Sequence, residues 1–256
     1  NYLQNIWARD KYTLEVRSLL RYHNQPARIT IDGDRQSLDL QQLYMDHSLS
    51  FLRKKGNLTR QYTAGVTGDL NSLRNGTSLY FTPNYQLNRH KWNLSFNLPL
   101  VWTAFPEADF SRLAVNPFLY INYKLNYAWR FSFHANYREN YGDITDFYPD
   151  AYRTDYRNVR INNAIMPVNR TQSYSLYGEY KNTIREFFAT LSLGHNRGWS
   201  DRIFEQQVRD AQIALVSHRL SNHSSGWTLK GTFSKGFYDD GLKASLNYLL
   251  GRNQAE

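Results

Sequence analysis

The sequence predicts an all-β protein, an antiparallel up-and-down transmembrane β-barrel, on three observations. Polar and apolar residues alternate with a period of two along most of the chain, and the alternating segments are each about ten residues long. Short and long connections follow one another between these segments. About ten residues is the length that a tilted strand needs to cross a bilayer, and short turns at one end with longer loops at the other are typical of such barrels.

Composition narrows the class of protein. The 256 residues include 31 Lys and Arg against 22 Asp and Glu, a net charge of +9, with 16% aromatic residues and no Cys. Without Cys the chain has no disulfide framework, zinc-thiolate site or thiol nucleophile. The mean hydropathy is −0.67, and no apolar run approaches the ~18 residues of a membrane-spanning helix.

The clearest strands are four consecutive segments, residues 78–87, 92–100, 112–125 and 127–138, each with strict alternation. Their apolar positions define the side that we expect to contact lipid, whereas Asn, Ser, Thr, Tyr, Arg and Lys occupy the other side. The expected lipid-facing residues are Leu79, Phe81, Leu94, Phe96, Leu98, Leu119, Ile121, Phe131 and Phe133.

Weaker alternation predicts further strands along the rest of the chain, about eleven to thirteen in all. These lie near residues 12–22, 28–31, 38–53, 58–70, 174–180, 187–195, 211–220, 227–237 and 242–250. No helical stripe and no linker interrupts them. We therefore expect residues 1–256 to form one barrel unit, without a plug or a signal peptide, and to be part of a larger barrel.

The connections fall into two groups. Short turns are expected at residues 54–57, 88–91, 124–126, 181–184 and 221–224. Longer loops are expected at residues 103–112, 139–171 and 196–210, with the short segments 71–76 and 236–241 on the same side. Pro83, Pro99 and Pro117 fall inside predicted strands, where they cannot donate a ladder hydrogen bond, so they should mark bulges or strand portions above the membrane.

Aromatic residues gather near the ends of the predicted strands. Trp92, Tyr123, Tyr127, Trp129, Tyr180 and Phe187 flank short turns, and Trp102 lies at the opposite end of its strand. This placement is typical of the two aromatic girdles at the headgroup levels of a membrane barrel.

One long loop is a candidate ligand site. It combines carboxylates with aromatic rings, which can bond sugar hydroxyls and stack on sugar faces. The candidate residues are Tyr141, Asp143, Asp146, Phe147, Tyr148, Asp150, Tyr152, Asp155 and Tyr156. The alternative is a solvated loop whose Tyr residues pack on neighbouring loops. The spacing matches no calcium-binding loop, and we expect no metal and no cofactor.

A basic set is predicted on the polar side of adjacent strands: Arg112, Lys124, Arg130, His134 and Arg138. It could attract anionic solutes or pair with acidic residues of a plug, or it could serve ordinary solvation and ion pairing. With the net positive charge, it suggests membrane lipids and lipopolysaccharide as partners. Basic residues are dispersed and no basic helix occurs, so we expect no nucleic-acid binding.

Enzymatic activity is not expected. The seven His residues show no metal-ligand spacing, and no nucleophile elbow, phosphate-binding loop or dinucleotide fingerprint is present. Asp46 and His47 suggest a dyad at the barrel rim, but neighbouring residues of a strand point to opposite faces.

The segment Leu43–Phe51, with its hairpin through residues 54–57 into residues 61–70, resembles the barrel of TonB-dependent outer-membrane receptors of the divergent kind. Residues 114–138, 173–194 and 227–251 look similar. The resemblance covers most of the chain, but no sharp motif carries it. It implies about 22 strands around an N-terminal plug, with TonB supplying energy across the periplasm.

We therefore expect an outer-membrane barrel, most of all the barrel portion of a TonB-dependent receptor that imports a nutrient. The alternatives are a structural or assembly barrel that scaffolds lipoprotein partners, and an enzyme located at the barrel rim.

Overall fold

The computed structural model describes residues 1–31, 34–71, 73–142, 146, 151–163, 166–209, 212–237 and 241–255. Side chains are described for the same residues except 25–40 and 209. None of the described helices is both long and apolar enough to span a membrane.

Strands dominate the described residues, and one 3-10 helix, η1 (Pro106–Ala108), interrupts them. The strands are β1 (Tyr2–Arg9), β2 (Tyr12–Ile31), β3 (Asp34–Lys55), β4 (Leu58–Asn71), β5 (Asn75–Arg89), β6 (Trp92–Asn97), β7 (Leu100–Phe105), β8 (Phe110–Val115), β9 (Phe118–Lys124), β10 (Trp129–Asn140), β11 (Tyr152–Arg153), β12 (Asn158–Ile161), β13 (Asn169–Asn182), β14 (Phe187–Arg209), β15 (Gln212–Phe237) and β16 (Leu242–Ala255).

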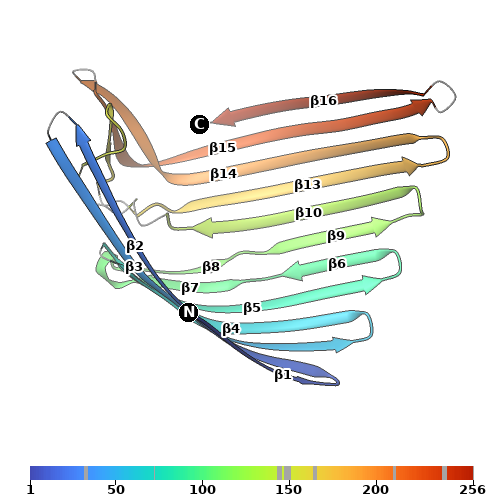
Figure 1. Cartoon of the computed structure of the whole chain (residues 1–256), viewed down its shortest axis with the longest axis horizontal. Helices are drawn as coiled ribbons and strands as arrows, with labels where there is room; N and C mark the ends of the chain where they lie inside the picture. The colour runs from blue at the N-terminus through green and yellow to red at the C-terminus, as the bar shows by residue number, and fades with distance from the viewer. Residues whose placement is uncertain are drawn as a thin grey trace.

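All sixteen described strands belong to one sheet (Figure 1). Each full-length crossing of the sheet lies beside the crossing that precedes it in the chain, with β9 next to β6 and β13 next to β10. The pairs are antiparallel except β12, which lies parallel to β15. We call one crossing of the sheet from end to end a pass. Strands β6 and β7 together make one pass, and so do β8 and β9, so the described chain makes twelve passes. This agrees with the eleven to thirteen strands expected from the sequence, and the up-and-down antiparallel fold is confirmed.

The two ends of the sheet differ, and we call them the turn end and the loop end. At the turn end the chain reverses at residues 10–11, 56–57, 90–91, 125–128 and 183–186, and there β15 ends and β16 begins. At the loop end lie the connections at residues 72–74, 106–109 and 141–168. Four of the predicted short turns, and the long loop 139–171, therefore occur where the sequence places them.

The predicted turn at residues 221–224 and the predicted loop at residues 196–210 are wrong. Both segments lie in the hairpin of β14 and β15, which continues as a two-stranded ribbon beyond the rest of the sheet (Figure 1). Its outer part lacks strict alternation, with the continuous apolar run Ile213–Val216 on β15, while backbone pairing persists. Since β15 makes a single pass, residues 236–241 lie at the turn end and not at the loop end.

The hairpin of β2 and β3 also extends past the predicted strands. The sequence divides this region into residues 12–22, 28–31 and 38–53, but the register runs unbroken from Tyr12 opposite Arg53 to Ile31 opposite Asp34. A tilted strand needs about ten residues to cross the hydrocarbon. The additional residues therefore extend the barrel wall beyond the membrane at the loop end.

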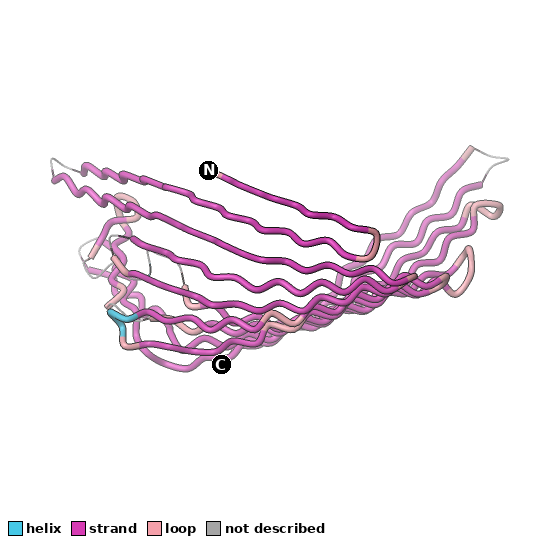
Figure 2. Tube along the Cα trace, turned by 90° about the horizontal axis from the view of Figure 1, so that it is seen from below, coloured by secondary structure: helices cyan, strands magenta, loops and turns pink. Residues whose placement is uncertain are grey.

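The sheet curves into a trough (Figure 2). Side-chain exposure places its apolar face outside and its polar face inside. Ladder register places Phe96 opposite Leu119 and Ile121 opposite Phe133, as expected for the lipid-facing set. Apolar-face residues such as Leu79 are 51% exposed, whereas Asp46 on the polar face is only 8% exposed. Side chains crowd together on the concave side of a curved sheet, so these values identify the polar face as the concave one.

An aromatic girdle follows the turn end on the apolar face. The ring centroids of Trp92 and Tyr123 lie 4.3 Å apart, those of Trp129 and Tyr180 4.7 Å, and those of Tyr180 and Phe187 5.7 Å. These contacts join five rings on five strands, in one pair and one group of three, at the level where amphipathic rings meet lipid headgroups. The predicted girdle is confirmed at this end.

The three prolines lie side by side on successive passes. Pro99 and Pro117 fall in the breaks between β6 and β7 and between β8 and β9, while Pro83 remains within β5. Each carbonyl accepts a backbone N–H from the next pass, from Leu98 to Pro83 at 3.0 Å, from Asn116 to Pro99 at 2.9 Å and from Tyr137 to Pro117 at 3.0 Å. The sheet thus stays hydrogen-bonded across the breaks despite the missing donors.

The two faces predict opposite responses to a charge. Phe96 lies four residues from Trp92 in the girdle, near the middle of the apolar band, so Phe96→Arg should lower the free energy of unfolding by about 2–4 kcal/mol. Asn97→Arg places the same charge on the polar face and should cost much less. Urea unfolding in lipid vesicles measures both, and equal costs would contradict the assignment of the faces.

Candidate functional site

A hydrogen-bonded group on the polar face centres on Asp46 in β3. One carboxylate oxygen accepts a bond from Arg17 Nη2 in β2 at 2.8 Å, and the other accepts a bond from the Tyr80 hydroxyl in β5 at 2.8 Å. The group therefore joins β2, β3 and β5 across the inside of the trough. The sequence analysis did not single it out, because its members are far apart in the chain.

Gly65 makes this group possible. It lies on β4, between Asp46 on one side and Tyr80 on the other, and the tyrosine ring crosses above it. A Cβ at residue 65 would come within 2.5 Å of the Tyr80 ring and 2.7 Å of the His47 carbonyl oxygen. Only glycine leaves room for the tyrosine to reach Asp46.

A second carboxylate, Glu139, lies at the loop end of β10. Arg112 Nε lies 2.6 Å and Arg170 Nε 2.9 Å from its oxygens, and the Tyr141 hydroxyl donates a hydrogen bond at 3.0 Å. Burial, reinforced by the hydrogen bond to Glu139, raises the pKa of Tyr141, so this phenol stays protonated and keeps its donor. Two cations and one donor thus hold Glu139 at the base of the long loop.

An aromatic cluster packs beside this carboxylate. Tyr141 meets Phe110 edge to face at 5.2 Å, and Phe105 lies 6.0 Å from Phe110. The Arg74 guanidinium lies 3.6 Å from the centroid of the Phe105 ring, and burial lowers the pKa of Arg74 to about 10. The cluster ties the loops at residues 72–74 and 106–109 to the start of the loop at residues 141–168.

A third carboxylate, Asp146, anchors that loop to the extended ribbon. Arg160 Nη2 lies 2.7 Å and Arg202 Nη2 2.9 Å from the same oxygen. Both guanidinium groups also lie over the Phe204 ring, at 4.7 and 4.8 Å from its centroid. Asp146 is 7% exposed, so its charge is balanced by the two arginines and not by water.

Strand β12 completes the anchor by pairing with β15 in parallel. Asn162 and Ser217 are fully buried at this junction, and the Ser217 hydroxyl donates to the Asn162 carbonyl. Asn163 Nδ2 donates to the Ser217 carbonyl at 2.8 Å. The described part of the long loop is thus a folded element packed against the ribbon.

The predicted ligand residues separate into three groups. Tyr141, Asp146 and Tyr152 belong to the folded base, where Tyr152 is 8% exposed. Asp155 and Tyr156 lie exposed at a tip, where hydrogen bonds from Asn158 and the backbone lower the pKa of Asp155. The remaining residues, Asp143, Phe147, Tyr148 and Asp150, lie outside the described residues. Ligand binding by the tip stays a prediction.

The predicted basic set is divided between the two ends of the sheet. Arg130 lies opposite Lys124, and both line a cleft of about 430 Å³ on the polar face at the turn end. Arg130 also lies 3.6 Å from Glu179, whereas Arg112 pairs with Glu139 at the loop end. His134 lies opposite Tyr120 and Arg138 opposite Thr171, between these ends.

The ion pairs favour the structural interpretation for Arg112 and Arg130, and the Arg130–Lys124 cleft remains a candidate for anionic solutes.

Asp46 and His47 point to opposite faces, as expected, since His47 Nδ1 lies 2.8 Å from the Ser18 hydroxyl and not near Asp46. Within the described ranges no three His, Asp or Glu side chains come together in a way that could hold a metal ion.

The crossing of Tyr80 over β4 can be tested at Gly65. Gly65→Ala should displace the ring from Asp46 and lower the free energy of unfolding by about 1–3 kcal/mol. Gly194→Ala is the matched control, because the nearest atoms to its Cβ would lie at 3.8 Å, and it should change stability by less than about 1 kcal/mol. Similar losses for both variants in urea unfolding would disprove the role of Gly65.

The anchor of the long loop can be tested at Asp146. Asp146→Asn keeps the shape of the side chain but removes the counter-charge of the nearly buried Arg202 and the partly exposed Arg160, at a cost of about 3 kcal/mol. Protease added to intact cells should then cleave residues 141–168 faster. Asp155→Asn changes an exposed carboxylate of the same loop and keeps its turn acceptor, so it should leave the cleavage rate unchanged.

Comparisons with known proteins identify the fold. No family model and no curated protein matches the sequence. Among solved structures, the copper transporter OprC has a TM-score of 0.65 at 10% identity, covering 98% of this chain and 46% of its own. The ferric citrate transporter FecA has a TM-score of 0.52 at 9% identity, covering 98% and 42%. The siderophore receptor PirA from Pseudomonas aeruginosa has 0.50 at 8% identity, covering 98% and 56%.

The chain thus spans about half the length of these receptors and is similar to them along nearly all of its own. At such low identity the likeness concerns the fold alone. A barrel wall of this fold with an exposed apolar band belongs in the outer membrane, as the sequence predicts. The chain therefore has the barrel fold of the TonB-dependent outer-membrane receptors.

Proposed function

We propose that this chain forms the barrel wall of a TonB-dependent receptor that imports a nutrient across the outer membrane. The observation that carries the proposal is the match of 98% of the chain to the barrel of a copper transporter with a TM-score of 0.65. The proposed role involves binding and passage, with no chemical step on the solute.

The polar face suits such a role. A receptor of this kind encloses a plug that must move or rearrange, so its inner wall should be rigid and hydrophilic. The Asp46 group supplies a fixed ion pair on that side, between Asp46 and Arg17, together with a hydrogen bond from the Tyr80 hydroxyl. Paired charges hold the wall in one shape without leaving a strong net field to trap solutes.

The loop end suits the capture of a ligand. The long loop is anchored through Asp146 and presents Tyr156, which is 66% exposed, at its tip beside Arg157. An exposed aromatic ring on a firmly anchored loop can stack on a ligand at a low cost in conformational entropy. We propose that this tip contributes to the first binding of the nutrient.

Energy-dependent uptake tests the proposal. The three relatives are named for copper, a siderophore and ferric citrate, so radiolabelled copper(II), a ferric siderophore and ferric citrate are the probes. Cells that carry the full-length protein should accumulate one of them above a deletion strain, and collapse of the proton-motive force should abolish the difference. A passive pore would keep its uptake, and a scaffold for lipoproteins would import none of the probes.

A pair of variants tests the tip separately. Tyr156→Ala should leave the amount of folded protein unchanged and raise the concentration for half-maximal uptake by about three- to ten-fold, the loss of one aromatic contact. Tyr152→Ala removes a buried ring and should make the loop sensitive to protease. Unchanged half-maximal uptake in Tyr156→Ala would exclude the tip from ligand binding.

A further inference from the structure

The apolar face changes character at one level along β13 to β16. From the turn end towards the loop end, aliphatic residues give way first to aromatic rings and then to polar and basic side chains. On β14 the order is Leu191, Leu193, His195, Arg197 and Trp199, and the residues opposite on β15 are Gly231, Leu229, Trp227, Ser225 and His223. On β16 Leu250 lies opposite Leu229, Arg252 opposite Trp227 and Gln254 opposite Ser225.

This level coincides with the outer boundary of the membrane. Phe187 belongs to the girdle at the turn end, and Arg197 lies ten residues further along the same strand. Ten residues span about 33 Å along a strand and about 25 Å along the membrane normal at the usual tilt, which is the height of the apolar band. Arg197 thus reaches the headgroup region of the outer leaflet, and Arg252 can extend to it.

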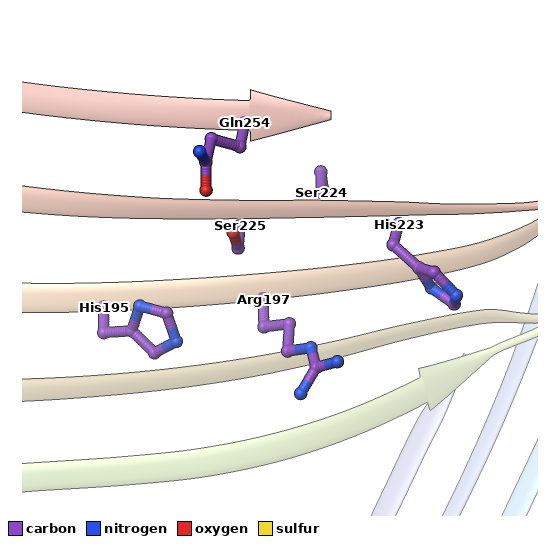
Figure 3. A pocket seen from close by; sticks show the side chains of 6 residues that line it. All are labelled: His195, Arg197, His223, Ser224, Ser225 and Gln254. Carbon is purple, nitrogen blue, oxygen red and sulfur yellow. The ribbon is translucent and has the colours of Figure 1, made fainter. Parts of the chain in front are cut away.

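A shallow cleft of about 310 Å³ lies at this level, lined by side chains from three strands (Figure 3). Its lining residues are His195, Arg197, His223, Ser224, Ser225 and Gln254. The His195 ring packs 4.2 Å from Trp227, and the Arg197 guanidinium lies 4.6 Å from the Trp199 ring. Aromatic contacts therefore hold the His195 ring and the Arg197 guanidinium beside the cleft.

The charge of this cleft is uncompensated. Within the part of the chain that the structure describes, neither Arg197 nor Arg252 forms an ion pair, in contrast to Arg170 on the neighbouring β13. The carboxylate nearest in register, Glu139, is already held by Arg112 and Arg170. Two exposed arginines without a counter-charge at the headgroup level are free to pair with a phosphate group from outside the chain.

We propose that the outer patch, which comprises His195, Arg197, Ser225, Arg252 and Gln254, binds the phosphate-bearing headgroup of a glycolipid of the outer leaflet. Arginine pairs with phosphate through several parallel hydrogen bonds, and the Ser and Gln side chains can bond sugar hydroxyls. The aliphatic residues directly below the outer patch continue the surface for the acyl chains of the same lipid. This site is independent of the proposed import.

The test uses the full-length protein extracted from outer membranes in mild detergent. The variant Arg197→Gln with Arg252→Gln removes both charges of the outer patch. The matched control, Lys54→Gln with Lys55→Gln, removes two exposed charges at the turn end. After exchange of the detergent, native mass spectrometry measures the phosphorylated glycolipid that remains bound per protein, and gel mobility before and after heating checks that the barrel is folded.

The outer-patch variant should retain at least about ten-fold less glycolipid than the wild type, and the control should stay within about two-fold. Replacement of both arginines by Lys should restore part of the binding, because an ammonium group still attracts phosphate. Equal retention by the wild type and the outer-patch variant would overturn the proposal.

A second measurement needs only the wild-type protein. Titration with the same glycolipid, intact or with its phosphates removed, should show at least about ten-fold weaker binding of the dephosphorylated form. Inorganic phosphate at the same concentration should not displace the intact lipid. Equal binding of both lipid forms, or displacement by free phosphate, would refute a lipid headgroup site.

Discussion

The constraint on which the structure depends is the pairing of every backbone N–H and C=O group where water is absent. Within hydrocarbon a strand can meet it only by hydrogen bonding to neighbours on both sides, which forces the chain into long antiparallel passes. The pleat of those passes then sends successive side chains to opposite faces. The carbonyl groups of the three prolines are paired as well. Each accepts a hydrogen bond from a backbone N–H of the next pass, at the breaks between β6 and β7 and between β8 and β9.

The two faces created by the pleat have separate tasks. The apolar face carries exposed Leu and Phe side chains between aromatic rings, and on β14 and β16 basic side chains follow at the level where headgroups would meet it. The polar face carries its charges in fixed groups such as Asp46 with Arg17 and Tyr80. Because a carboxylate in a crowded, partly dry setting needs a partner, these groups both stabilise the wall and hold its shape.

At the loop end, stability no longer comes from contact with lipid. The ribbon of β14 and β15 stands beyond the sheet and receives the long loop through β12, the Asp146 ion pairs and the buried Asn162–Ser217 contact. The sequence analysis treats residues 139–171 as one loop with scattered acidic and aromatic residues. The structure divides the described part of it into a buried base and an exposed tip that includes Asp155 and Tyr156.

The alternation of polar and apolar residues by itself determined the strands, the face to which their side chains point, the turn-end girdle and the barrel class. Each of these follows from the two-residue period and from the length of the alternating segments. Prediction from this pattern failed at residues 196–210 and 221–224, where strict alternation is lost and the local pattern does not distinguish a paired strand from a loop. Only the tertiary structure brought Arg17, Asp46 and Tyr80 together, and placed Arg160 and Arg202 on Asp146. Such contacts depend on strand register and sheet curvature, which the order of residues along a single strand does not encode.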